Sequence, residues 1–138
     1  MNNDATIQAI IGYIENHLED DLSLDKISHD LNYSKFYLSR VFSAKINCTI
    51  HKYIQRRRLT LAAQKLVETD KPVIDIAYEA HYGSQQAFSL AFRRLYLCTP
   101  QTYRRNRIFY PAQTKISIIN PLCSFSHSHF MSGGKLAA

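Results

Sequence analysis

Two segments of the chain, around Arg40 and around Gln86, place long side chains with paired hydrogen-bonding groups beside small hydroxyl side chains. The planar guanidinium of Arg40 can donate two parallel hydrogen bonds to O6 and N7 of guanine, and a glutamine amide can pair with N6 and N7 of adenine. Each such pair discriminates against other bases by about 1–3 kcal/mol. The alternatives are a phosphate contact for Arg40 and an ordinary exposed helix position for Gln86.

The spacing of apolar residues indicates which neighbours of Arg40 and Gln86 face outward. Leu38, Val41 and Phe42 recur at helical spacing and are needed inside. Phe36 either meets a thymine methyl group or packs into the core. The candidate base contacts are Phe36, Ser39, Arg40, Gln85, Gln86 and Ser89.

Arginine residues and expected helix starts near both segments are candidates for holding a phosphate backbone. Arginine binds phosphate directly, and free N–H groups at the N-terminus of a helix attract anions. Lys plus Arg number 17 against 11 Asp plus Glu, a net charge of +6 that attracts polyanions but does not by itself establish nucleic-acid binding. We expect about half of the clustered arginines to touch phosphate. The candidate phosphate contacts are Ser34, Lys35, Tyr37, Thr49, Arg56, Arg57, Ser84, Arg93, Arg94, Thr99, Tyr103 and Arg104.

Apolar periodicity predicts helices along the chain and no strand. A first helix covers 7–18, with Asn3 or Asp4 as its N-cap, and a long helix reaches from Thr49 to about Glu68. Asp70 is expected to cap the following helix, with Pro72 in its first turn. The remaining helices are short: one after Ser23, one from near Lys35, one around Phe88 to Leu95 and one opened by Thr99 and Pro100.

The chain contains an internal repeat. The pattern Phe-x5-Cys-Thr-x3-Tyr-x3-Arg occurs from Phe42 to Arg57 and again from Phe92 to Arg107, 50 residues later at every position. Upstream of each copy lie a short helix and a turn, and the second turn is one residue longer than the first. Each copy therefore has the parts of a helix-turn-helix. One copy fits any helical hairpin, but two copies in a basic chain favour a DNA-binding unit.

These residues resemble the AraC/XylS family of bacterial transcription regulators, in particular the small stand-alone members such as MarA, SoxS, Rob and TetD. The resemblance runs from about Ile7 to Arg105 and includes both helix-turn-helix units and the linker in order. It implies an all-α fold of about seven helices, with two helix-turn-helix subdomains joined by a long connecting helix. The matching segments are SKFYLSRVF (34–42), YIQRRRL (53–59), AQKL (63–66), SQQ (84–86) and AFRR (91–94), followed by Thr99-Pro100 and Tyr103-Arg104.

The predicted DNA-binding domain spans 5–107, with helix-turn-helix units at about 23–46 and 71–96 and a linker helix at about 49–68. A linker of about 18 residues is roughly 27 Å long, against about 34 Å between successive major-groove faces. One molecule can thus place two recognition helices in neighbouring groove segments. The resemblance implies a monomer without cofactor on asymmetric promoter DNA, an activator, and contact with RNA polymerase.

Two residues depart from the family pattern. His81 stands where the family usually has glycine, and Gly83 follows two positions later, so this turn is expected to be shifted or strained. Leu90 stands where close relatives carry a base-contacting arginine. Leu90 cannot form a hydrogen bond, so the second unit should contribute apolar or shape readout with weaker sequence preference.

Residues 108–138 are predicted to be a disordered tail, and its last four residues, KLAA, resemble an expression-vector remnant. Cys123, His127 and His129 lie in this tail, but a fourth metal ligand is missing, so we predict no metal site. The cysteines show no CxxC spacing and the N-terminus has no signal pattern, which fits a bacterial cytoplasmic protein that associates with the nucleoid when bound. No apolar run approaches the roughly 20 residues that span a bilayer, so no membrane partner is expected.

The sequence also bears on two other function classes. The acidic cluster Glu19-Asp20-Asp21 has no partnered His, Ser or Cys and no glycine-rich phosphate loop beside it, which argues against an enzyme. A protein-interaction module built from helical hairpins remains the alternative. Exposed apolar groups on the recognition faces would favour that module, whereas Arg40 and Gln86 pointing outward favour DNA.

Overall fold

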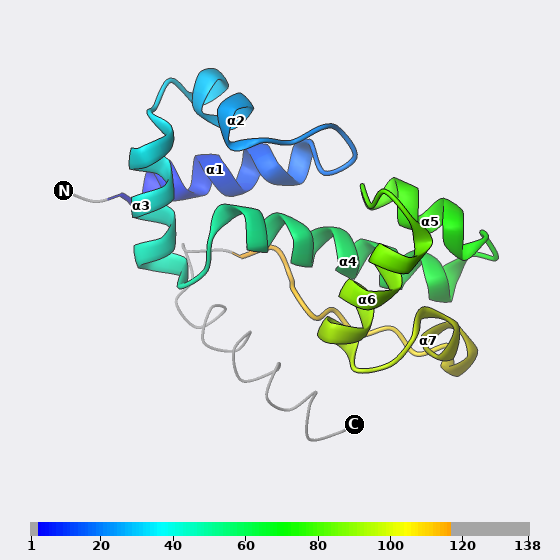
Figure 1. The fold of residues 1–138 in the computed structure, drawn as a ribbon. Helices are drawn as coiled ribbons and strands as arrows, with labels where there is room; N and C mark the ends of the chain where they lie inside the picture. The colour runs from blue at the N-terminus through cyan, green and yellow to red at the C-terminus, as the bar shows by residue number, and fades with distance from the viewer. Residues whose placement is uncertain (1–2, 117–138) are drawn as a thin grey trace.

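The computed structural model describes residues 3–116 of the 138-residue chain. Within that range the fold is all-helical and has no strand, which confirms the predicted fold class (Figure 1). None of these helices is long and apolar enough to cross a membrane. The helices are α1 (Asp4–Asn16), α2 (Leu24–Leu31), α3 (Lys35–Ile46), α4 (Ile50–Glu68), α5 (Val73–Glu79), α6 (Gln85–Tyr96) and α7 (Pro100–Asn106).

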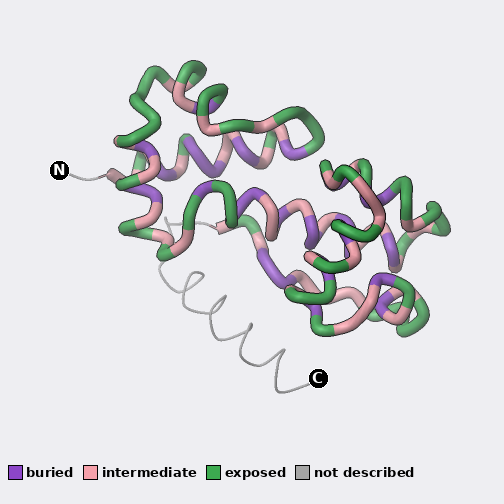
Figure 2. The backbone as a smooth tube through the Cα atoms, viewed as in Figure 1, coloured by how far each residue is buried: buried purple, intermediate pink, exposed green. Residues whose placement is uncertain are grey.

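Helix α4 is shared by two lobes, each with its own apolar core (Figure 1). The first lobe packs α1, α2 and α3 around the N-terminal part of α4, where Ile50, Tyr53 and Ile54 are buried. The second lobe packs α5, α6 and α7 around the part of α4 that begins at Leu59. Figure 2 shows that buried residues are concentrated on α1 and α4, whereas the shorter helices expose much of their surface. The lobes therefore share only one continuous element of secondary structure, α4.

Hydroxyl side chains start five of the helices, because each accepts a hydrogen bond from an N–H group of the first turn. These bonds fix the position at which each recognition helix and the linker begin. Ser34 and Ser84 cap α3 and α6, the second helices of the two helix-turn-helix units. The other three caps are Ser23 on α2, Thr49 on α4 and Thr99 on α7.

Two predicted caps differ in the structure. Asp70 does not cap α5: Pro72 occupies the N-cap position with extended backbone (φ −57°, ψ 143°), and the helix begins at Val73. Asn3 is the N-cap residue of α1, but its side chain makes no capping bond. Its Oδ1 accepts a hydrogen bond from the Tyr37 hydroxyl at 3.0 Å instead, so a contact between elements has replaced the local one.

The turn of the second helix-turn-helix is strained, as predicted, but it is not shifted. His81 has a left-handed backbone (φ 66°), which costs little for glycine and more for other residues. Gly83 does not take over this role, since no described glycine has a positive φ. Asn32 holds the same conformation in the first unit (φ 62°), and asparagine tolerates it because its short polar side chain can bond locally.

The predicted disordered tail is wrong for residues 108–116. This segment passes along α4 from the second core to the first, where Ile116 packs. Ala112 and Gln113 are buried, and Figure 2 shows this buried stretch after α7. We call residues 109–116 the strap. The predicted vector remnant and Cys123, His127 and His129 lie outside the described residues.

Candidate nucleic-acid interface

Helix α3 presents Phe36 and Arg40 outward because its apolar stripe is fully used in the first core. Leu38 and Phe42 are fully buried there. Phe36 keeps 77% of its surface exposed, so its predicted alternative as a core residue is wrong. The Arg40 guanidinium carbon lies 5.6 Å from the centre of the Tyr37 ring, a cation–π distance that restrains the arginine without using its hydrogen-bond donors. Ser39 is half-buried.

Two polar contacts fix the start of α3. The Lys35 ammonium lies 2.7 Å from a carboxylate oxygen of Asp25 on α2, at the surface. The Tyr37 hydroxyl bonds to Asn3. Both side chains are predicted phosphate contacts that have partners within the protein, and exposed ion pairs of this kind are weak. Lys35 is therefore available to exchange its partner, whereas Tyr37 is held more firmly because its bond is partly buried.

Helix α6 presents Gln85, Gln86 and Ser89 in the same way. Gln86 is exposed, and Gln85 and Ser89 are half-buried. Leu90 is 54% exposed on this helix, so α6 displays an apolar side chain to solvent at this position.

An open hollow of about 490 Å³ lies between these polar residues and α5. Its apolar wall comes from Ile74 and Tyr78, which are 42% and 55% exposed. Sequence reasoning missed both. The signal was present, because both residues fall outside the inward stripe of Val73, Ile76 and Ala77 and so have no role in the core.

Most predicted phosphate contacts lie at the surface. Arg93 and Arg94 are exposed on α6, and Arg56 is half-exposed on α4. The hydroxyls of Ser34, Thr49 and Ser84 accept capping bonds, which leaves their O–H groups able to donate to a phosphate. The Thr99 hydroxyl also accepts a capping bond, but its O–H donates to the Thr102 hydroxyl at 3.0 Å. The first turn of α4 adds free backbone N–H groups.

Two predicted phosphate contacts, Arg57 and Tyr103, are wrong because their side chains are buried. Arg57 is 9% exposed, and its guanidinium bonds to both carboxylate oxygens of Glu15 (2.6 and 2.9 Å) and to the Gln113 carbonyl (2.7 Å). Burial lowers the pKa of Arg57, but the Glu15 carboxylate outweighs it, so the pKa is raised and the group stays charged. Tyr103 is 3% exposed, and its hydroxyl bonds to the backbone of Tyr110. Neither side chain reaches the surface where a phosphate would lie.

Arg104, like Arg57, uses its guanidinium for bonds within the protein, but it makes fewer of them. Its Nε donates to the Leu66 carbonyl at 2.9 Å and a terminal nitrogen donates to the Thr69 carbonyl at 3.3 Å. These bonds satisfy carbonyl groups at the C-terminus of α4, which have no partner in the helix. The side chain therefore joins α7 to α4, and its role as a phosphate contact is reduced.

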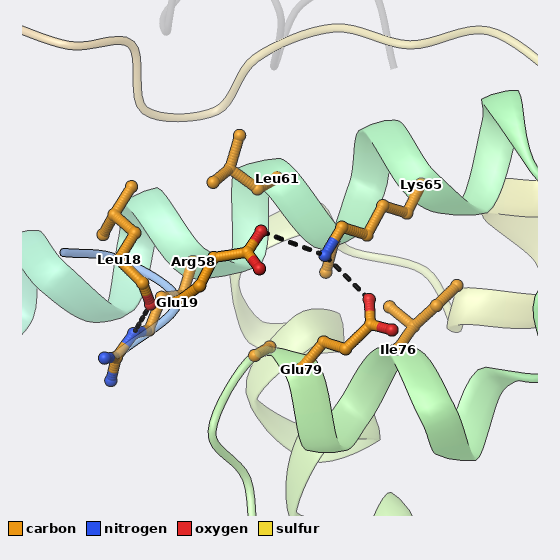
Figure 3. Close-up of a pocket in the computed structure, with 9 residues that line it drawn as sticks. Leu18, Glu19, Arg58, Leu61, Lys65, Ile76 and Glu79 are labelled. Atoms are coloured by element: carbon orange, nitrogen blue, oxygen red, sulfur yellow. Dashed lines mark hydrogen bonds and ion pairs between the residues drawn. The ribbon is translucent and has the colours of Figure 1, made fainter. Parts of the chain in front are cut away.

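A polar network connects the lobes on the α5 side of α4. The Lys65 ammonium lies 2.7 Å from Glu79 and 3.7 Å from Glu19, which follows α1 (Figure 3). Arg58 donates to the Leu18 carbonyl at 2.9 Å. The His81 ring nitrogen Nε2 lies 3.0 Å from the Glu19 carbonyl, so the strained residue of the second unit contacts the first lobe. The pocket at this junction holds about 10 Å³, which leaves room for no more than one water molecule.

The repeated cysteines behave as packing residues. Cys48 packs on the first core and Cys98 on the second, and neither is in a disulfide. Burial raises the pKa of both thiols, so they stay protonated and unreactive at neutral pH. Among the described residues no group of three His, Cys, Asp or Glu side chains is placed to hold a metal ion.

Comparison with known proteins agrees with this geometry. A family model described as a helix-turn-helix domain matches residues 27–106. The regulatory protein SoxS of Salmonella typhimurium is 41% identical over 104 residues, covering 75% of this chain and 97% of SoxS. The chain belongs to the AraC/XylS family of DNA-binding transcription regulators. Within that family it falls in the subgroup of SoxS and the right origin-binding protein of Escherichia coli, which is 37% identical over 106 residues.

Other relatives support the family assignment. The TetD protein of transposon Tn10 from Escherichia coli is 36% identical over 103 residues, 75% of each protein. A solved AraC-type transcriptional regulator from Chromobacterium violaceum superposes with a TM-score of 0.71 at 27% identity, covering 75% of this chain and 92% of that one. In this AraC/XylS protein α2–α3 and α5–α6 are therefore the two helix-turn-helix units, and α3 and α6 are the recognition helices.

Proposed function

We propose that this AraC/XylS protein binds promoter DNA as a monomer and reads two half-sites, one with α3 and one with α6. The observation that carries the proposal is that Arg40 and Gln86 are exposed on α3 and α6. Both of these recognition helices pack against one continuous helix, α4 (Figure 1). The 19 residues of α4 give a length of roughly 28 Å at 1.5 Å per residue, close to the 34 Å between successive major-groove faces. A second copy of the chain is not needed to supply the second half.

The two halves contribute differently in this proposal. Arg40 supplies direct readout of a guanine, and Phe36 contacts a thymine methyl group. In the second half Gln86 supplies the hydrogen bonds, supported by Gln85 and Ser89, and Leu90 adds an apolar contact. The first half-site should therefore carry most of the sequence preference. Phosphate contacts from Lys35, Arg56, Arg93 and Arg94, with the first turn of α4, position the protein without reading sequence.

The proposed regulatory role is activation by recruitment of RNA polymerase in the bacterial cytoplasm, with the protein on the nucleoid when bound. What supports it is membership of the subgroup that contains SoxS, together with the shape of the fold. If α3 and α6 enter the major groove, helices α1, α2 and α7 retain exposed surface for a protein partner.

The test is selection of binding sites from random duplex DNA by the purified protein, repeated with Arg40→Ala. The expected result is a site of about 20 base pairs in two parts, of which only one loses its preference in the variant. Arg107→Ala is the matched control, since Arg107 is an exposed arginine paired with Asp70 and belongs to no proposed contact set. Affinity should fall steeply with salt, with a slope set by the number of phosphates neutralised.

Two outcomes count against the proposal. Equal binding to every sequence, unchanged by Arg40→Ala, would indicate a nonspecific binder or a protein-interaction module whose apolar recognition face includes Phe36 and Leu90. A palindromic site bound by two copies, seen as a doubled mass in the complex, would exclude the monomer.

A further inference from the structure

The strap, residues 109–116, has no role in the proposed DNA contacts, and it follows the end of the family match at residue 106. It nevertheless packs on both cores. Phe109 and Tyr110 lie against the second core, Ala112 is buried within it, and Ile116 lies against the first core. One short segment therefore touches both helix-turn-helix lobes.

Side-chain hydroxyls hold the strap along its length. Backbone N–H groups of the strap donate to hydroxyl oxygens from α7, α6 and α4 in succession, at 3.0–3.2 Å. Because the acceptors are buried or nearly so, water cannot easily replace these bonds. The four bonds run from Tyr110 to Tyr103, from Ala112 to Tyr96, from Gln113 to Thr60 and from Ile116 to Tyr53.

The two end points of the strap are equivalent positions of the internal repeat. Tyr53 and Tyr103 occupy the same place in the repeated pattern, 50 residues apart, and each lies in the core of its own lobe. Tyr103 accepts the N–H of Tyr110, and Tyr53 accepts the N–H of Ile116. A fully extended chain covers at most about 20 Å over this stretch, so the strap sets an upper limit to the distance between the two tyrosines.

The middle of the strap crosses α4 where the two cores meet. On α4 the last buried residue of the first core is Ile54 and the first buried residue of the second core is Leu59, while half-buried Leu61 packs against the first core. Gln113 bonds in this region: its N–H donates to Thr60 and its carbonyl accepts from Arg57, which also holds Glu15 of α1. These bonds oppose bending of α4 where the two cores meet.

From these contacts we propose that the strap is a brace that fixes the distance and angle between the two recognition helices, and thereby selects the spacing of the two half-sites. Its positioning residues are Tyr53, Thr60 and Tyr103. This inference rests on the proposed bipartite binding. A protein without the brace keeps both helix-turn-helix units and their base contacts, but α4 bends more freely and accepts half-sites at several spacings.

The experiment uses the full chain with Tyr53→Phe, Tyr103→Phe and the double variant. Phenylalanine keeps each ring in its core and removes only the hydroxyl that holds the strap. Tyr82→Phe is the matched control, because the Tyr82 hydroxyl is buried without a hydrogen-bond partner among the described residues and does not touch the strap. Hydrogen exchange of the Tyr110 and Ile116 amides, measured by NMR, reports whether the strap has loosened.

Affinity is then measured for duplexes that carry the selected half-sites at the selected spacing and with one or two base pairs added or removed. We expect the wild type and Tyr82→Phe to prefer one spacing strongly, and the double variant to lose at least five-fold of that preference. Affinity for the first half-site alone should not change. A general loss of folding would lower that affinity as well, so this measurement separates the two explanations. Each single variant should show an intermediate loss and serves as the test if the double variant does not fold.

Two results would overturn the inference. Faster amide exchange with an unchanged spacing preference would mean that the strap does not position the lobes. Unchanged amide exchange in the double variant would mean that the hydroxyls do not hold the strap. Failure of the proposed function looks different, because the wild type would then select no bipartite site at all.

Discussion

The two helix-turn-helix units have the same construction and different surfaces. Both recognition helices begin at a serine cap and bury an equivalent stripe around Phe42 or Phe92. The first displays Arg40 restrained by an aromatic ring, whereas the second displays the exposed apolar side chain of Leu90. The repeat fixes the buried side of each unit and leaves its outer side free to vary. One unit therefore suits hydrogen-bonded readout of a base, and the other suits apolar contact.

The turns of the two helix-turn-helix units also differ in what they contact. Asn32 and His81 hold the same left-handed conformation, but only His81 reaches the other lobe, through the Glu19 carbonyl. The local backbone strain at His81 thus accompanies a contact with a residue that is distant in the chain. The second unit is thus tied to the first by its turn, while the first turn is satisfied within its own unit.

The largest predicted effect is a difference in stability between variants of Arg57 and Arg107, the two arginines of the repeat. Arg57→Met should lower the free energy of unfolding by about 3 kcal/mol, because it leaves the Glu15 carboxylate partly buried without its partner. Arg107→Met should have only a small fraction of that effect, since its pair with Asp70 is exposed. Urea denaturation of both variants measures the difference.

The double variant Arg57→Met with Glu15→Gln provides the control for this comparison. It should recover part of the lost stability, because no uncompensated charge remains. Equal effects of Arg57→Met and Arg107→Met would show that the buried ion pair contributes nothing specific to the first lobe.

The next largest effect is the loss of stability at alkaline pH that the two repeat tyrosines, Tyr53 and Tyr103, are expected to cause. Burial raises the pKa of Tyr53 to about 12, although the N–H of Ile116 partly opposes this, and burial also raises the pKa of Tyr103. A pKa that is higher in the folded state gives stability that is complete below pH 10 and is lost as pH rises toward 12. For Tyr53 this amounts to about 2–3 kcal/mol.

Urea titrations between pH 9 and pH 12 test this expectation. Tyr53→Phe and Tyr103→Phe should each flatten the alkaline decline, because the group that must ionise on unfolding is gone. Tyr33→Phe serves as the control, because Tyr33 is 41% exposed and lies outside both buried cores. A decline that is identical in all three variants would assign the pH dependence to other groups.

The third prediction concerns DNA affinity and the difference between α3 and α6. Arg40→Ala should weaken binding to the selected site by about 1–3 kcal/mol and remove the preference for guanine at one position. Leu90→Ala should cost less and change sequence preference little. Leu90→Arg sharpens the comparison, since it should add a preference in the second half-site. Competition binding against site variants measures all three, and an equal loss for Arg40→Ala on every sequence would make Arg40 a phosphate contact.

The features that could be predicted from the sequence are those that depend on near neighbours in the chain. Apolar stripes and hydroxyl caps act within one or two turns of a helix, so Ser34, Thr49, Ser84 and Leu38 lie where their spacing indicates. Arg57 could not be placed in this way. It looks like one more basic residue in a run of three, and its buried position depends on Glu15, 42 residues away.

The same limit explains why the tail was predicted wrongly. The strap has no apolar period, because it is held by single bonds from its backbone to hydroxyls far along the chain. The repeat identified Tyr53 and Tyr103 as equivalent, but spacing alone does not say what a hydroxyl binds. Ile74 and Tyr78 were missed for the opposite reason: they contribute little to the core, and core spacing was the signal used.

The smallest predicted effect concerns Asn32 and His81, the left-handed residues of the two helix-turn-helix turns. Asn32→Gly should change stability by only a few tenths of a kcal/mol, since asparagine already tolerates this conformation. His81→Gly should also be nearly neutral, but for a different reason: it relieves about 1 kcal/mol of backbone strain and loses the bond to Glu19. His81→Ala keeps the strain and loses the bond, so it should destabilise by about 1 kcal/mol. Thermal unfolding of the three variants decides, and a clearly stabilising His81→Gly would show that the His81 contact between lobes contributes little.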